Sequence, residues 1–227
     1  MSFEAILFDC DGVLVDSEKI YVDVEREHLA RIGLHYDLDE YMDRFQGLGA
    51  TDFWAALDRD HRAIGKGPLP ETFADDLDAD TMDRINRELT EISGIKQLLE
   101  VHDGPRAVAS SSRLRRLIHK LQHTGLCDFF EPHIYSGEQV ENGKPAPDLF
   151  LFAAARLGVA PAKCLVIEDS ANGVKAGLAA GMTVWGFVGG GHSHDGHREQ
   201  LAAAGAHRVI DSHDDLAKLL VGDVATT

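Results

Sequence analysis

Residues 3–12 read Phe3-Glu4-Ala5-Ile6-Leu7-Phe8-Asp9-Cys10-Asp11-Gly12, an apolar run that ends in two acids and a glycine. The apolar part predicts a β-strand buried on both faces, and open α/β sheets place their functional groups at the carboxyl ends of such strands. Residues i and i+2 of an extended chain share a face, so we expect Asp9 and Asp11 to address one site while Cys10 points away as a core thiol. Because Asp and Gly are also common in turns, an acidic turn without a function is the ordinary alternative.

The composition limits the size and the partners of the protein. Its 227 residues, 44% of them hydrophobic, suffice for one large domain or two small ones with a core. Lys and Arg number 22 against 38 Asp and Glu, a formal net charge of −16, which argues against nucleic acid and anionic membranes as partners. An anionic substrate would therefore need a local cation to reverse the sign of the potential.

The sequence has no feature typical of an exported or membrane-spanning protein. No basic and apolar leader precedes the first strand, and no apolar run approaches the roughly 20 residues of a membrane span. The three cysteines, Cys10, Cys127 and Cys164, are too scattered for a disulfide framework or a zinc motif. These observations favour a cytoplasmic protein.

The second half of the chain alternates apolar runs with helical patterns, which indicates βαβ units and a parallel sheet. Strands are expected at 106–109, 164–167, 183–187 and 207–210, and helices at 113–123 and 171–180. The run at residues 3–8 would then be a central strand. The predicted fold class is α/β.

A long helical insertion follows the first strand. About 90 residues separate Asp16 from the next predicted strand at 106–109, far more than a βα loop needs. Apolar positions at helical spacing predict helices at 18–29, 38–45, 52–57 and 79–91, with a turn at 65–70. A small core is expected from Phe45, Phe53, Trp54 and Leu57.

A predicted strand runs into hydroxyl groups in Ala109-Ser110-Ser111-Ser112. Serine is a preferred helix N-cap, so capping of the next helix is the ordinary interpretation. The same hydroxyl groups, with the free N–H groups of a helix start, also suit an anion site.

A stiffened, charged segment lies at Gly143-Lys144-Pro145-Ala146-Pro147-Asp148. Two prolines restrict the chain around Lys144, and Asp148 is placed to cap the next helix. A lysine in a loop is normally solvated, but one held beside acids offsets the charge of a nucleophile and of a phosphoryl oxygen.

Val166-Ile167-Glu168-Asp169-Ser170 ends another predicted strand in paired carboxylates. Carboxylates at the ends of neighbouring strands make an oxygen site suited to Mg²⁺. Stability alone does not explain such acids, because they repel one another without a cation. Ser170 is expected to start the following helix.

In this order, the segments resemble the haloacid dehalogenase superfamily, specifically its β-phosphoglucomutase-like phosphohydrolases. The resemblance is carried by Asp9-Cys10-Asp11-Gly12-Val13-Leu14-Val15-Asp16-Ser17-Glu18, by Ser110, by Gly143-Lys144-Pro145-Ala146-Pro147-Asp148, and by Glu168-Asp169-Ser170 with Gly173 and Gly181. It covers essentially the whole chain. It implies a Rossmann-like parallel-sheet core of residues 1–16 and 88–227 and an inserted α-helical cap of residues 17–87.

The resemblance also implies a two-step phosphoryl transfer. Asp9 would be the nucleophile that forms an aspartyl-phosphate, and Asp11 would act first as general acid and then as general base. Ser110 would hold a phosphoryl oxygen, and Lys144 would balance charge.

The implied cofactor is Mg²⁺. Its ligands would be Asp9, the backbone carbonyl of Asp11, and Asp169, with Glu168 in or beside the coordination sphere. Together with Lys144, the metal would reverse the local potential despite the net charge of −16.

Asp11 bears on the reaction type, because the dehalogenases and phosphonate-cleaving members of this family lack an acid at its position. Sugar phosphomutases of the group carry a Lys-Gly pair and then an arginine in the cap, and a histidine in the first cap helix. Here Gln46, Ala50 and Tyr21 stand at those positions. We therefore predict a Mg²⁺-dependent phosphatase of a small phosphorylated metabolite, such as 6-phosphogluconate or another sugar or sugar-acid phosphate, with a phosphomutase as the alternative.

Six polar residues are expected to contact the substrate, although each is also an ordinary exposed side chain: Glu18, Tyr21, Arg44 and Gln46 from the cap, and Ser111 and Arg113 from the core. The glycine-rich stretch after Phe187 contains His192, His194 and His197, which we interpret as a mobile polar loop rather than a transition-metal site.

A rival from another class is a receiver-like signalling domain, which also accepts phosphate on an aspartate. The helical insertion, the paired acids at the first strand and the chain length argue against it. A catalytically inactive binding module is disfavoured by the intact acids. We expect a monomer or a weak dimer.

Overall fold

The structure is a computed structural model that describes residues 3–45, 48 and 50–224. The chain divides into two compact units, Met1–Glu18 with Leu89–Thr227, and Lys19–Glu88. We call them the sheet unit and the helical unit. Within the described residues, no helix has the length and apolar character needed to span a bilayer.

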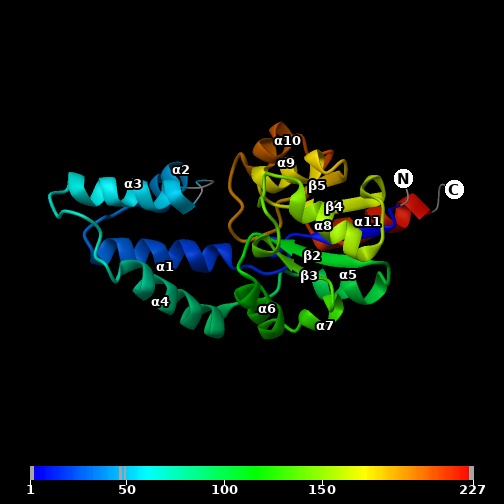
Figure 1. The fold of residues 1–227 in the computed structure, drawn as a ribbon, viewed down its shortest axis with the longest axis horizontal. Coiled ribbons are helices and arrows are strands. Elements are labelled where there is room, and N and C mark those ends of the chain that lie inside the picture. The colour runs from blue at the N-terminus through cyan, green and yellow to red at the C-terminus, as the bar shows by residue number, and fades with distance from the viewer. Residues whose placement is uncertain (1–2, 46–47, 49, 225–227) are drawn as a thin grey trace. The chain divides into compact units, whose positions relative to one another are not determined.

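The sheet unit is built on a parallel six-stranded sheet, which confirms the predicted α/β, Rossmann-like fold class (Figure 1). The strand order is β3-β2-β1-β4-β5-β6, and every neighbouring pair is parallel. The strands are β1 (Ala5–Phe8), β2 (Arg106–Ser110), β3 (Ile134–Ser136), β4 (Cys164–Glu168), β5 (Thr183–Phe187) and β6 (Arg208–Ile210). Strand β3 was not predicted from the sequence, because three residues are too few to show a periodic pattern.

Helices and short 3₁₀ turns connect these strands (Figure 1). They are α5 (Ile95–Val101), α6 (Leu114–His123), α7 (Cys127–Phe130), η1 (Gly137–Gln139), α8 (Asp148–Leu157), η2 (Pro161–Lys163), α9 (Ala171–Ala179), α10 (His197–Ala203) and α11 (His213–Val224).

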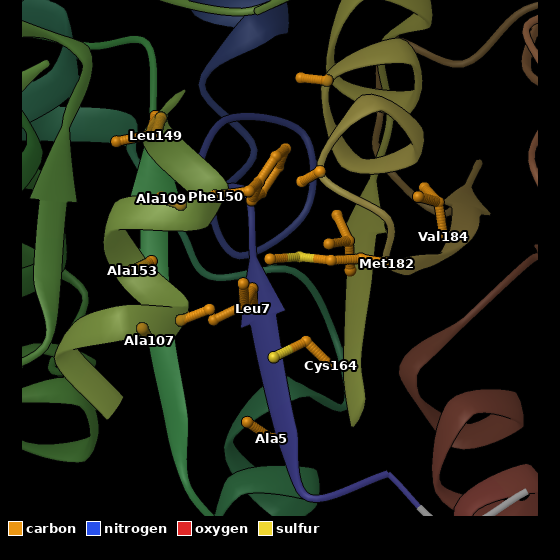
Figure 2. Close-up of a cluster of buried hydrophobic side chains, with 14 of the residues drawn as sticks. Ala5, Leu7, Ala107, Ala109, Leu149, Phe150, Ala153, Cys164, Met182 and Val184 are labelled. Carbon is orange, nitrogen blue, oxygen red and sulfur yellow. The ribbon is translucent and has the colours of Figure 1, made fainter. Parts of the chain in front are cut away.

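One face of the sheet packs against α8 and α9 through small and medium apolar side chains (Figure 2). Leu7 of the central strand and Val166 of β4 are fully buried there, together with Phe150 and Ala153 of α8. The alanines of α8 and of β2 allow helix and sheet to approach closely. Both sides of β1 are buried, as expected for a central parallel strand.

The helical unit contains α1 (Glu18–Arg31), whose first residue belongs to the sheet unit, α2 (Leu38–Phe45), α3 (Ala50–Ala63) and α4 (Phe73–Glu88). Phe45 and Leu57 are buried and Phe53 and Trp54 are half-buried, with edge-to-face contacts linking Phe45 to Phe53 and Phe53 to Trp54. The predicted bounds of the last helix were wrong. Its helix-favouring residues extend back to Phe73, and residue 91 is instead bridged to Val15.

His213 is a fully buried histidine at the start of α11. Its Nε2–H donates to the carbonyl oxygen of Val13 at 2.8 Å, and its ring stacks on Phe187 with the centroids 4.6 Å apart. Burial lowers the pKa of His213 to about 4, so the folded protein holds this ring neutral.

We expect the free energy of unfolding to fall as the pH decreases from about 6.5 toward 4. In this window the unfolded chain takes up a proton on His213 and the folded chain does not. This difference lowers the free energy of unfolding by up to about 3 kcal/mol. Urea denaturation across the pH series measures it. His213→Gln should remove this part of the pH dependence, whereas replacing the exposed His35 by Gln should not; equal slopes for His213→Gln and wild type would contradict the assignment.

Candidate active site

The strand order places the two predicted acidic segments side by side. Phe8 of β1 is in register with Val108 of β2 and with Ile167 of β4, so Asp9 follows β1 at the level of Glu168, the last residue of β4. The amide of Asp9 donates to the carbonyl oxygen of Ile167 at 3.0 Å. The chain proceeds from β1 toward β2 and β3 on one side and from β4 onward on the other, and such a switch point is where open α/β sheets bind ligands.

Lys144 connects the acids of the two strands. Its Nζ donates to Asp9 Oδ1 at 2.5 Å and to Glu168 Oε1 at 2.6 Å, and it lies 4.8 Å from the centre of the Phe150 ring. The side chain is only 4% exposed. Burial disfavours the charge, but attraction to Asp9 and Glu168 outweighs it and raises the pKa of Lys144.

The other carboxylate oxygen of Glu168 accepts hydrogen bonds from the residue that starts α9. Glu168 Oε2 accepts from the amide and the hydroxyl of Ser170, both at 2.9 Å. Ser170 is the N-cap of α9, as predicted, and accepts from the amide of Gly173. A Cβ on Gly173 would lie 1.7 Å from Glu168 Oε1, so a glycine leaves the room that this buried carboxylate occupies.

Asp9 is a buried carboxylate beside other carboxylates. Burial raises its pKa well above the ordinary value against the pull of Lys144, and repulsion from Glu168, Asp169 and Asp11 adds to the effect. The pKa of Asp169 is raised for similar reasons, first by burial and then by Glu168.

Asp11 has a different set of partners. Its Oδ1 accepts from Ser17 Oγ and from Lys120 Nζ, and its Oδ2 accepts from Ser112 Oγ at 2.8 Å. Burial acts to raise the pKa of Asp11, but attraction to Lys120 and the hydrogen bonds from Lys120, Ser17 and Ser112 prevail and lower it. In this structure Asp11 is therefore held as a carboxylate.

Two glycine-containing loops meet at Asp169. Gly12 has a φ of +74°, and a Cβ there would lie 1.9 Å from Asp169 Oδ2, so only glycine fits the turn after Asp11. His192 Nε2 lies 3.1 Å from Asp169 Oδ2, and His197 Nε2–H donates to the backbone oxygen of Asp169 at 2.7 Å.

The stretch that we interpreted as a mobile polar loop brings His192 and His197 to Asp169. Both side chains are buried against Asp169, and the His194 ring stacks on His197 with the centroids 5.5 Å apart. The sequence showed their spacing, but it did not show which strand end they would reach.

The serines at the end of β2 and just after it do not cap α6. Its N-cap is Arg113, without a side-chain cap bond, and the amide of Leu114 donates to Glu138 Oε2 at 3.0 Å. Ser110 is buried, and its hydroxyl accepts from the amide of Ser112 at 3.1 Å. The capping interpretation is therefore wrong. Ser111, one of the predicted contact residues, is exposed.

Two further expectations were a helix cap from Asp148 and a core thiol at Cys10. Asp148 does not cap α8: the N-cap is Pro147, and Asp148 Oδ1 accepts from Asn142 Nδ2 at 3.1 Å. Cys10 is fully buried, and burial raises the pKa of its thiol well above the ordinary value. This confirms the expected core thiol.

The predicted contact residues are distributed over both units. Glu18 ends the first segment of the sheet unit, and its pKa is raised to about 8 by burial and then by repulsion from Asp11. Arg44 forms a bidentate ion pair with Asp60 inside the helical unit, with Nε to Oδ2 at 2.6 Å. Tyr21 is half-buried in the same unit.

The two remaining predicted contact residues are Gln46 and Arg113. Gln46 lies outside the described residues. Arg113 is exposed and lies 3.9 Å from Glu138.

The donor set fits a divalent cation. Four carboxylates, Asp9, Asp11, Glu168 and Asp169, share the carboxyl ends of β1 and β4 with two lysines, and their mutual repulsion contributes to raising the pKa of Asp9. A bound cation would relieve this repulsion. Among the described residues, no three His, Cys, Asp or Glu side chains are gathered as ligands; three of the four carboxylates contact a lysine instead, Asp9 and Glu168 with Lys144 and Asp11 with Lys120.

Sequence reasoning missed four side chains that contact the acids: Ser17, Ser112, Lys120 and His192. For Lys120 a signal was present. It follows Leu117 by three residues and precedes Leu121, both fully buried in α6, so a charged residue interrupts the apolar face of that helix.

Residues 3–181 match the family model of the haloacid dehalogenase-like hydrolases. The chain is 31% identical over 218 residues to a phosphorylated carbohydrates phosphatase of Thermotoga maritima, covering 94% of this chain and 96% of that protein. It is 29% identical over 191 residues to the 6-phosphogluconate phosphatase of Escherichia coli strain K12, covering 84% and 85%.

A solved structure is similar over nearly the full length. It is a HAD family hydrolase from Deinococcus radiodurans R1 with bound phosphate and sodium, with a TM-score of 0.83 and 40% identity over 98% of this chain and 97% of that one. The strand order, the acids at the ends of β1 and β4, and these matches agree. This chain belongs to the haloacid dehalogenase-like hydrolase family.

Proposed function

We propose that this enzyme, a phosphoric monoester hydrolase of the haloacid dehalogenase-like family, hydrolyses a small sugar or sugar-acid phosphate with Mg²⁺ and through an aspartyl-phosphate intermediate. The observation that carries the proposal is the position of Lys144, whose ammonium group contacts both Asp9 and Glu168 at the switch point of the sheet. Asp11 follows two residues after Asp9, and Cys10 between them is buried.

In the proposed first step, a carboxylate oxygen of Asp9 forms a bond to phosphorus and the ester P–O bond breaks. The electron pair of that bond goes to the leaving alkoxide oxygen, which takes a proton from Asp11. The structure holds Asp11 as a carboxylate, and an adjoining anionic phosphoryl group favours its protonation.

In the proposed second step, Asp11 takes a proton from a water molecule whose oxygen attacks phosphorus. The P–O bond to Asp9 breaks, its electrons return to the Asp9 carboxylate, and inorganic phosphate leaves. The ionised state of Asp11, with hydrogen bonds to both oxygens, supports this role as a base.

Mg²⁺ would be held by the carboxylates of Asp9 and Asp169 and the backbone carbonyl of Asp11, and it would supply charge stabilisation for the phosphoryl group. Glu168 would orient Lys144, since Lys144 and Ser170 already occupy both of its oxygens. The buried Ser110 would hold a phosphoryl oxygen.

Three observations support sugar phosphates as the substrate class and hydrolysis as the reaction. Two relatives are named as phosphatases, one of phosphorylated carbohydrates and one of 6-phosphogluconate. The similar solved structure carries phosphate. Ala50 stands where the mutases of this family carry an arginine for a second phosphate.

The helical unit would act as the cap, with Glu18 and Tyr21 as contact residues. We place the enzyme in the cytoplasm as a monomer or weak dimer.

The test is a panel of phosphorylated metabolites assayed for phosphate release, including 6-phosphogluconate and a sugar bisphosphate. We expect release that EDTA stops and that added Mg²⁺ restores. Isomerised sugar phosphate without phosphate release would instead indicate the mutase. A stable phosphoprotein without turnover would indicate the receiver-like alternative.

A further inference from the structure

Lys120 is a fully buried lysine on α6 whose ammonium group contacts Asp11 Oδ1. It also donates to Ser112 Oγ at 2.9 Å, and Ser112 Oγ donates to Asp11 Oδ2 at 2.8 Å. Lysine, serine and carboxylate thus form a closed triangle that engages both oxygens of Asp11. Lys120 is distinct from Lys144, which contacts Asp9 and Glu168.

The fold itself does not require an ammonium group at this position. The residue lies on the apolar face of α6 between Leu117 and Leu121, where a hydrophobic side chain would pack. Burying an ion pair rarely stabilises a protein more than an apolar replacement of similar volume. The contact with Asp11 is therefore the feature that accounts for a buried lysine at this position.

The triangle restrains the orientation of Asp11. Rotation of the carboxylate would break the bond from Lys120 or the bond from Ser112. A base must be held in one place to receive a proton from a water molecule.

We propose that Lys120, with Ser112, is the positioning residue that holds the Asp11 carboxylate for the hydrolysis of the aspartyl-phosphate. This inference rests on the proposed function. In that step the proton of water passes to Asp11, the water oxygen bonds to phosphorus, and the P–O bond to Asp9 breaks with return of its electrons to Asp9. Lys120 acts through Asp11, whose carboxylate it contacts.

The two half-reactions can be separated with p-nitrophenyl phosphate. Its leaving group departs without a proton, so formation of the aspartyl-phosphate releases nitrophenolate without help from Asp11, whereas hydrolysis of the intermediate still needs a base. Rapid mixing with an excess of substrate records the first step as a burst and the second as the slower steady rate. The value of kcat/KM reports the first step alone, because that step is irreversible once nitrophenolate has left.

For Lys120→Met we expect a retained burst and a nearly unchanged kcat/KM, while kcat falls by about 100-fold and KM falls with it. Asp11→Asn should show the same pattern more strongly. In the Asp11→Asn background, Lys120→Met should have no further effect on kcat. The matched control is Lys163→Met, which removes an equal charge at an exposed lysine paired with Glu4 and should behave as wild type.

A purely structural role would lower the burst and the steady rate together, and that result would overturn the inference. So would a wild-type kcat in a folded Lys120→Met protein. If Lys120→Met does not fold, Ser112→Ala tests the same triangle, and it should lower kcat while sparing kcat/KM; an unchanged kcat would also overturn the inference. Failure of the proposed function looks different, because wild type would then release no nitrophenolate at all.

Discussion

Replacing Asp9 by Asn is expected to reduce phosphate release by about 10⁴-fold or more, the size of loss seen when a nucleophile is removed. The amide nitrogen and oxygen of Asn do not form the acyl-phosphate bond, and neither Cys10 nor Asp11 takes over: the first is buried and the second is held by Lys120. Phosphate release from the preferred substrate of the panel measures the effect.

The fold should survive this substitution. Burial and neighbouring acids raise the pKa of Asp9, so a neutral side chain of the same size relieves repulsion, while Lys144 keeps its contact with Glu168. We therefore expect an unchanged or higher Tm for Asp9→Asn. Asp148→Asn is the matched control, because Asp148 contacts only Asn142 among its described hydrogen bonds, and it should retain activity. A fully active Asp9→Asn enzyme would refute the mechanism.

Lys144→Met is the second change with a large expected effect, and it should lower both activity and stability. It leaves Asp9 and Glu168 buried without their shared cation, and loss of one partner of a buried pair costs about 3–5 kcal/mol. The charge that Lys144 supplies to the phosphoryl group is lost as well, so we expect turnover to fall by about 10³-fold. Urea denaturation and steady-state kinetics measure the two effects.

A second substitution separates the two losses. In the double variant Lys144→Met with Glu168→Gln, the buried carboxylate is replaced by an amide whose oxygen can still accept from Ser170. We expect much of the stability to return while activity stays low. Stability and activity that recover together would show that Lys144 contributes through the fold alone.

The sheet and the main acids were predictable because they follow from local patterns. Each buried strand is a short apolar run, and parallel strands bring their carboxyl ends to one edge, so Asp9 and Glu168 were expected together. Lys144 was expected beside them from the family resemblance. The fold class and the family were confirmed.

Other contacts depend on distances in space that no local pattern encodes. The bond from Lys120 to Asp11 joins residues 109 positions apart, and the pair of His192 and Asp169 depends on how the loop after β5 returns to the sheet. The capping of α6 by Glu138 was missed for the same reason, since the donor and the acceptor lie on different segments.

The packing of Gly12 has a consequence for the way the chain is synthesised. Residues 9–16 leave the ribosome long before residues 190–192, yet the two segments are in close contact: a Cβ on Gly190 would lie 2.8 Å from the Gly12 carbonyl oxygen, and the amide of Gly191 donates to Asp16. The first loop therefore reaches its final form only after about residue 192 has emerged, and native contacts of such long sequence separation form late. A nascent chain stopped before this point carries the aspartates of the site without the neighbours that orient them.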